Sequence, residues 1–174
     1  MKDIIMKFLH RKETDSYYWK VRTKARESKN LISRFYNIYL HKKLMIKNNA
    51  SIPYTVSIVG SPCFPHGLNG IFVSLNARIG KNCTIFHQVT IGSNTLSDSK
   101  NIGAPQIGDN VYIGCGAKII GGIKIGNNVR IGANCVVIED VPDDSTVVLK
   151  KPRIIAHKMV KNNDFVAIGN LKTD

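Results

Sequence analysis

Two histidines stand in the sequence where an imidazole could act as a base. His66 lies in the turn "FPHGLNG" at residues 64–70, and His87 lies in "IFHQVTIG" at residues 85–92. A neutral imidazole can take the proton of a hydroxyl as that hydroxyl attacks an acyl group. His66 is therefore the candidate base. His87 is a second candidate base, or it lines the cleft in which the substrates would bind. Asn69 and Gly70 are further candidates for that cleft. A histidine that is hydrogen-bonded within its own turn is the non-catalytic alternative.

No cluster of His, Cys, Asp or Glu has the spacing of a metal site, so we expect no bound metal. The four cysteines are too few and too widely spaced for a disulfide scaffold in 174 residues. Cys83 and Cys135 fall at inward positions of the repeat described next. We expect both to be reduced thiols that serve as small apolar side chains.

A six-residue repeat organises the middle of the chain. Ile or Val recurs at Val73, Ile79, Ile85 and Ile91, and then at Ile107, Ile113, Ile119, Ile125, Ile131 and Val137. Gly follows six of these ten residues. A β-branched residue suits a short strand that fills a core, and Gly permits the sharp corner after it. Three such sides form a triangular coil of about 18 residues, and stacked coils bury one another. The repeat predicts a mainly β fold, a parallel β-helix over residues 50–149.

A polar segment, "NTLSDSKNIGAPQ" at residues 94–106, interrupts the repeat. Ile91 and Ile107 lie 16 positions apart, where 12 would keep two sides in register. Its composition is typical of a loop that protrudes from one coil, and such loops often carry function. Five of its side chains are candidates for binding a substrate: Asn94, Ser97, Asp98, Ser99 and Asn101.

The two ends of the chain are basic. The net charge is +13, and residues 1–49 contain 13 Lys/Arg against 4 Asp/Glu. Residues 12–47 read as helices, with Leu31, Phe35 and Ile38 on one face that Ile32, Tyr36 and Tyr39 broaden. We expect this segment to cap the open end of the β-helix, and a basic helix on a membrane surface is the alternative. Residues 150–174 read as a basic tail. His10, His41 and His157 read as surface residues.

The location and partners follow from the same features. We see neither a secretory signal nor an apolar run long enough to cross a bilayer. We therefore expect a cytoplasmic protein, and attachment to the inner face of the membrane is the alternative location. A charge run of this kind is more often a solvated helix face than a binding surface, and we expect no nucleic-acid partner.

The segments "HGLNGIFVSLNARIGKNCTIFHQVTIG" and "APQIGDNVYIGCGAKIIGGIKIGNNVRIGANCVVIEDVP" resemble the serine acetyltransferase branch of the hexapeptide-repeat acyltransferases, over about residues 52–153. The resemblance implies a left-handed β-helix, a homotrimer or a dimer of trimers, and acetyl-CoA as co-substrate. His66 followed by Gly70 takes the place of the family's catalytic His-x-x-Gly turn, with one extra residue between them.

The resemblance also implies positions for acetyl-CoA. Small residues of successive coils would present backbone amides to the pantetheine arm, and cations near a C-terminal proline would meet the nucleotide phosphates. The candidate residues are Gly92, Gly114, Cys115, Ala133, Lys150, Lys151 and Arg153.

Three departures from the family concern the acceptor. Pro65 stands where the family has an Asp before the catalytic His, Gly103 and Ala104 stand where its loop has Arg and His, and Ser51 stands where its catalytic carboxylate aligns. The charged groups that hold serine are therefore missing. We expect an O-acetyltransferase that acts on a sugar of a capsular or exopolysaccharide pathway. The alternatives are a serine acetyltransferase of cysteine biosynthesis and a non-catalytic trimeric β-helix scaffold.

Overall fold

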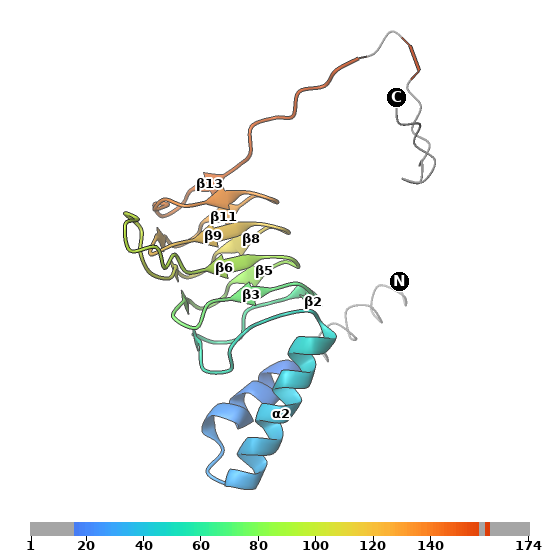
Figure 1. Cartoon of the computed structure of the whole chain (residues 1–174), viewed down its shortest axis with the longest axis vertical. Helices are drawn as coiled ribbons and strands as arrows, with labels where there is room; N and C mark the ends of the chain where they lie inside the picture. The colour runs from blue at the N-terminus through green and yellow to red at the C-terminus, as the bar shows by residue number, and fades with distance from the viewer. Residues whose placement is uncertain (1–15, 157–158, 161–174) are drawn as a thin grey trace, which may run out of the picture.

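The computed structural model describes residues 16–156 and 159–160. The chain begins there with a helical hairpin of residues 16–27 and α2 (Leu31–Lys47). Asn30 starts α2, because its side-chain oxygen accepts a hydrogen bond from the Ser33 amide at 3.0 Å. The hairpin lies at one end of a stack of coils, and the tail leaves from the other end (Figure 1). The predicted helical residues 12–15, together with His10 and His157, lie outside the described residues.

Short strands form the sides of the coils. They are β1 (Ser57–Ile58), β2 (Pro65–Leu68), β3 (Phe72–Val73), β4 (Arg78–Ile79), β5 (Thr84–Ile85), β6 (Thr90–Gly92), β7 (Gln106–Ile107), β8 (Tyr112–Ile113), β9 (Lys118–Ile120), β10 (Lys124–Ile125), β11 (Arg130–Ile131), β12 (Val136–Val137) and β13 (Thr146–Val147). Within the described residues they build three parallel sheets, in the orders β1-β4-β7-β10, β13-β11-β8-β5 and β12-β9-β6-β3. This is the predicted parallel β-helix.

The repeated Ile and Val residues point inward and stack in register. Val73 pairs with Ile91, 18 positions later, and Ile113 pairs with Ile131 at the same spacing. All ten of the repeated residues are buried, as are Cys83 and Cys135. The prediction that these cysteines act as small core residues is therefore confirmed, and neither of the two forms a disulfide.

The protruding segment is longer than the sequence spacing suggested. Ile79 pairs with Ile107, 28 positions later, so the loop adds ten residues to its coil rather than four. The error arose because Ile91 and Ile107 occupy successive sides of one coil, so six positions rather than twelve would keep them in register. Asn94 and Gly103 close the base of the loop through two backbone hydrogen bonds of 2.8 and 2.9 Å.

Asparagines hold one corner of the stack. Asn82, Asn110 and Asn128 have positive φ angles of 58°, 57° and 56°, which the corner requires. Their side chains form a ladder in which Asn110 donates to Asn128 at 2.8 Å and accepts from Asn82 at 3.2 Å, and Asn128 donates to Asp144 at 2.8 Å. Asn tolerates this left-handed backbone better than most other residues with a side chain. The same residue type therefore serves both the corner, through its backbone, and the ladder, through its side-chain amide.

Substitutions at Asn110 can separate the two contributions. Asn110→Gly removes the ladder but keeps the left-handed backbone, whereas Asn110→Ala removes the ladder and strains the corner. We expect Asn110→Ala to lower the free energy of unfolding by roughly 1–2 kcal/mol more than Asn110→Gly does. Equilibrium denaturation of both variants measures this difference, and equal losses would mean that φ at this corner carries no cost.

The helical hairpin packs differently from the prediction. The face predicted to cap the coils is exposed, with Leu31 64% and Phe35 68% accessible. The opposite side of α2 is buried instead, through Asn37, His41 and Met45. The cap is built mainly by aromatic contacts from the first helix, since Tyr18 and Trp19 both pack on Phe64 of the first coil. No helix in the described part of the chain is long and apolar enough to cross a membrane.

His41, predicted at the surface, is 5% exposed beside Tyr18 and Arg22. Burial, with the neighbouring Arg22 charge, lowers the pKa of His41 from 6.5 to about 4. Its Nε2 atom has no hydrogen-bond partner among the described residues. His41 is therefore neutral in the folded protein at pH 7.

This burial makes stability depend on pH. Below pH 6.5 the unfolded chain binds a proton at His41 that the folded chain does not bind until about pH 4. We expect the free energy of unfolding to fall through this window, by roughly 2–3 kcal/mol from this residue. Denaturation at several pH values should give a shallower decline for His41→Phe than for the wild-type protein, while Tyr39→Phe, a change at an exposed ring of α2, keeps the wild-type slope. A wild-type slope in His41→Phe would contradict the assignment.

Candidate active site

The first coil contains an extra stretch of chain that carries His66. Cys63 pairs with Thr84, and Phe72 pairs with Thr90. The side of the first coil between these two pairs therefore takes nine positions, whereas the same side of the second coil takes six. The longer segment contains β2, and Gly67 and Gly70 turn it with φ angles of 68° and 65°. A Cβ atom at Gly70 would also lie 3.1 Å from the Gln88 side chain. The insertion gives His66 an exposed, outward position.

His66 and His87 form a pair across the two coils. Their Nδ1 atoms lie 2.8 Å apart, and the rings of Phe86 and His66 are nearly perpendicular with centroids 5.3 Å apart. His87 is half-buried. One Nδ1 atom must donate and the other accept, so the pair shares one proton there. When His66 is the donor, its Nε2 atom has a free lone pair and can act as a base.

The pair adjoins a cleft of about 510 Å³. The cleft is lined by the end of α2 and by the outer side of the coils: Lys47, Asn48, Asn49, Asn69, Gly70, Phe72, His87, Gln88, Thr90 and Lys118. Asn69 and Gly70, the candidate cleft residues from the sequence, are among these lining residues. No carboxylate is among these residues, and Lys118 Nζ donates to the backbone oxygens of Gln88 and Gly116 at 3.0 and 2.8 Å. The cleft therefore offers amides and cations to a ligand.

The sequence did not indicate Lys47, Asn48, Phe72 or Lys118 as cleft residues. Phe72, Thr90 and Lys118 occupy the same outward position in successive coils. The repeat predicts that Thr90 and Lys118 are neighbours only if the loop is known to add ten residues to the 18 of a coil. Nothing in the sequence indicated that the end of α2 meets the coils at this place.

Above His87 the same corner position is occupied by Cys115 and then Ala133. The Gly116 amide donates to the His87 carbonyl, and the Asn134 amide donates to the Cys115 carbonyl. The amides of Cys115 and Ala133 donate to no group in the described structure. Cys115 is half-buried and Ala133 is exposed. Two free backbone donors, one coil apart, therefore continue from the histidine pair along the stack.

The other predicted acetyl-CoA positions differ in their surroundings. Gly114 is buried, its amide donates to Ile131, and a Cβ atom there would lie 2.7 Å from the Ala133 nitrogen. Its role is close packing of coils, so its amide is not available to a ligand. Gly92 lines a smaller pocket of about 160 Å³ beside Phe72 and Thr90. Lys150, Lys151 and Arg153 are exposed in the extended tail beyond β13, which runs away from the coils in Figure 1.

The loop does not reach the histidine pair within one chain. It leaves the corner between β6 and β7, whereas His87 lies at the corner between β5 and β6. Asn94 donates to Ser99, and Asn101 donates to the Ile138 carbonyl at 2.8 Å, so these polar groups hold the loop in shape. Of the loop's predicted substrate-binding residues, Ser97 and Asp98 are exposed, and Asn94, Ser99 and Asn101 are half-buried.

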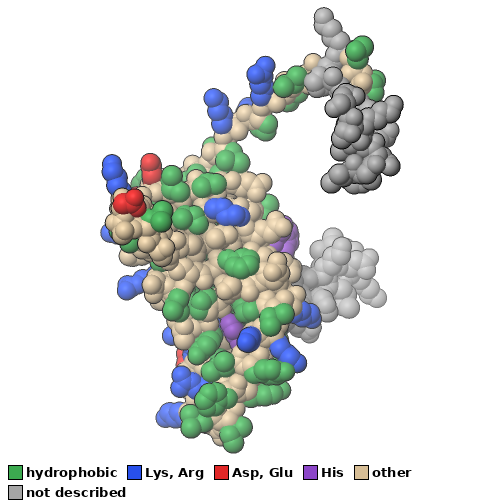
Figure 2. Space-filling view, viewed as in Figure 1, with side chains coloured by type: hydrophobic (Ala, Val, Ile, Leu, Met, Phe, Trp, Pro, Cys, Tyr) green, Lys and Arg blue, Asp and Glu red, His purple; other side chains and the backbone are tan. Residues whose placement is uncertain are grey.

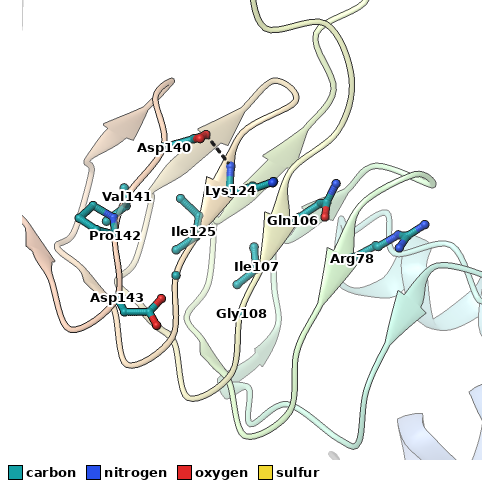
Figure 3. A pocket seen from close by; sticks show the side chains of 11 residues that line it. Arg78, Gln106, Ile107, Gly108, Lys124, Ile125, Asp140, Val141, Pro142 and Asp143 are labelled. Atoms are coloured by element: carbon teal, nitrogen blue, oxygen red, sulfur yellow. Dashed lines mark hydrogen bonds between the residues drawn. The ribbon is translucent and has the colours of Figure 1, made fainter.

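A second groove, of about 580 Å³, lies on the sheet of β4, β7 and β10 (Figure 3). Arg78, Gln106 and Lys124 stand in register along it, and Asp140 accepts a hydrogen bond from the Lys124 amide at 2.8 Å. It contains no histidine, cysteine or hydroxyl side chain. Its carboxylates, Asp140 and Asp143, accept hydrogen bonds from the backbone amides of Lys124 and Asn127, so both hold corners of the coils. The histidine cleft is therefore the candidate active site. Among the described residues no group of three His, Cys, Asp or Glu could hold a metal ion.

Comparison with known proteins identifies proteins that are similar to this chain. Residues 104–139 match the family described as bacterial transferase hexapeptide (six repeats). The serine acetyltransferase of Mycobacterium tuberculosis is 40% identical over 92 residues, which are 53% of this chain and 39% of that enzyme. This chain spans about two fifths of the length of the curated relatives that it matches.

Solved structures with the same fold are also serine acetyltransferases. Isoform 3 of Entamoeba histolytica, in complex with cysteine, is 33% identical with a TM-score of 0.60, over 72% of this chain and 44% of that one. The soybean enzyme complexed with serine is 32% identical with a TM-score of 0.59, over 78% of this chain and 53% of that one. The expected left-handed parallel β-helix is confirmed.

The histidine contact can be tested without any substrate. In the folded protein we expect the ¹⁵N signal of His66 Nδ1 to report a hydrogen bond, because it lies 2.8 Å from His87 Nδ1. His87→Phe should shift this signal to that of a free ring and leave the signals of His41 unchanged. An unchanged His66 spectrum in that variant would show that the two rings are not bonded in solution.

Proposed function

We propose that this chain is an acetyl-CoA-dependent O-acetyltransferase with His66 as the general base. The observation that carries the proposal is the Nδ1–Nδ1 contact of 2.8 Å between His66 and His87, beside an open cleft. The contact fixes which nitrogen is left for catalysis. The acetyltransferase names of the relatives and the free amides of Cys115 and Ala133 support acetyl-CoA as the donor.

The pair gives His66 the tautomer that the reaction needs. When His66 donates its Nδ1 proton to His87, His66 Nε2 takes the proton of the acceptor hydroxyl as the oxygen attacks the thioester carbon. The resulting imidazolium still donates to His87, whose lone pair stabilises it. The tetrahedral intermediate then collapses, the carbon–sulfur bond breaks, and the CoA thiolate takes the proton back from Nε2. His87 acts in place of the carboxylate that Ser51 replaces.

A homotrimer, or a dimer of trimers, would complete the site. In one chain the loop and the histidine pair lie at different corners of the triangular stack. Because the corners of neighbouring β-helices meet in a threefold arrangement, the loop of one subunit can reach the histidine cleft of the next. Ser97 and Asp98 are the exposed groups that the loop would bring there.

Serine is the first acceptor that we propose, because the relatives and the solved structures are named for it. The comparisons thus favour the alternative over the sugar that the sequence led us to expect. A sugar hydroxyl stays as the second candidate on one observation. The described lining of the cleft contains no carboxylate to pair with the ammonium group of serine.

Thiol release from acetyl-CoA tests the proposal, with serine and a panel of neutral and acidic sugars as acceptors. We expect His66→Ala to lower kcat/KM by roughly 10²- to 10⁴-fold. His87→Ala should lower kcat by about tenfold with little change in KM, and His87→Gln should restore part of it. Val59→Ala, at an exposed site on the coils, is the control. Wild-type turnover in His66→Ala would exclude the proposed base, and no turnover of any acceptor, together with no acetyl-CoA binding, would favour the scaffold alternative.

A further inference from the structure

The exposed face of α2 has no partner in the described chain. It consists of Leu31, Ile32, Phe35, Tyr36, Tyr39 and Ile46, each more than half exposed. These residues lie on the side of α2 opposite to the buried Asn37, His41 and Met45. In Figure 2 hydrophobic side chains gather at the end of the hairpin, farthest from the coils. Isolated exposed apolar residues are normal on a protein surface, but six large apolar side chains on one face of a helix form a contiguous patch. Such a patch marks an interaction site.

The surroundings of this patch are strongly basic. Residues 16–49 contain nine Lys/Arg and one Asp/Glu, so their net charge is +8. Lys42 and Lys43 lie on the same side of α2 as the patch, and Lys43 Nζ lies 4.9 Å from the centre of the Tyr39 ring. Blue side chains border the hydrophobic ones in Figure 2. An apolar and aromatic face with cations around it is typical of a helix that lies at a lipid–water interface.

The charge also argues against a symmetric dimer through α2 as the occupant. In a symmetric dimer the same patch meets itself, so Lys42 and Lys43 of one chain would face basic residues of the other. Glu27 is the one acidic residue of residues 16–49 that could pair with them. Like charges brought together in this way disfavour the contact. An anionic surface, in contrast, neutralises the same cations.

We propose that α2 docks this protein on an anionic membrane surface, with Phe35 and its apolar neighbours inserted among the lipid chains and Lys42 and Lys43 at the headgroups. The C-terminal end of α2 lines the histidine cleft through Lys47. Since 17 helical residues span about 25 Å, docking would hold the cleft within roughly that distance of the bilayer.

Vesicle flotation with the full chain tests the proposal. The probes are vesicles of phosphatidylcholine alone and vesicles with roughly one third phosphatidylglycerol. We expect binding to the anionic vesicles only, weakened at least about tenfold between low and high salt. Phe35→Ser with Tyr39→Ser should reduce the binding by at least about tenfold, since each side chain loses its apolar burial. Lys42→Glu with Lys43→Glu should reduce it as well.

Matched controls make the result decisive. Val59→Ser with Leu75→Ser changes two exposed apolar residues of the coils and should leave vesicle binding unchanged. The α2 variants should keep the wild-type melting temperature and the wild-type turnover of soluble acceptors, because their side chains touch neither the core nor the cleft. Absence of binding to anionic vesicles would overturn the proposal. Equal binding to neutral vesicles, or an α2 variant that changes the oligomeric mass instead of vesicle binding, would overturn it too.

Discussion

The inward stacking of branched side chains in register is the interaction on which this structure depends. Each coil buries its Ile and Val residues only against the coils on either side, as Ile91 does between Val73 and Ile119. Because successive side chains of a strand point to opposite faces, a shift by one position would expose the whole inward set. The register therefore fixes every outward and every corner position along the stack.

The candidate site arises where this regular frame meets its exceptions. The regular part supplies a column of equivalent corner positions, so that His87, Cys115 and Ala133 stand one above another. The irregular part supplies the candidate base, since the three extra residues of the first coil move His66 outward to meet His87. A coil with six residues on that side would have no place for this side chain. The inward residues of a coil thus pack the core, while its outward and corner residues form the candidate site.

Sequence patterns predicted the parts of the structure that repeat. The β-branched spacing indicated the coils, the core and the two inward cysteines, because one physical rule applies at each position. The patterns failed where contacts join distant segments. The exposure of Phe35 and the burial of His41 follow from how two helices meet the first coil, and no local spacing encodes that. The bond between His66 and His87 was missed for the same reason, since it depends on a bulge that brings two coils into contact.

The loop at the corner between β6 and β7 has a consequence for how such a protein can change. Asn94 and Gly103 close it at its base, and the coil continues in register on either side although ten residues have been added. Asn101 also joins the loop to the coils through Ile138 and Gly122, so the freely variable part is the exposed tip around Ser97 and Asp98. Exchange of this tip would leave the histidine pair and the corner amides in place. The exposed surface of such a scaffold can therefore change at one tip while the packed coils and the candidate site keep their geometry.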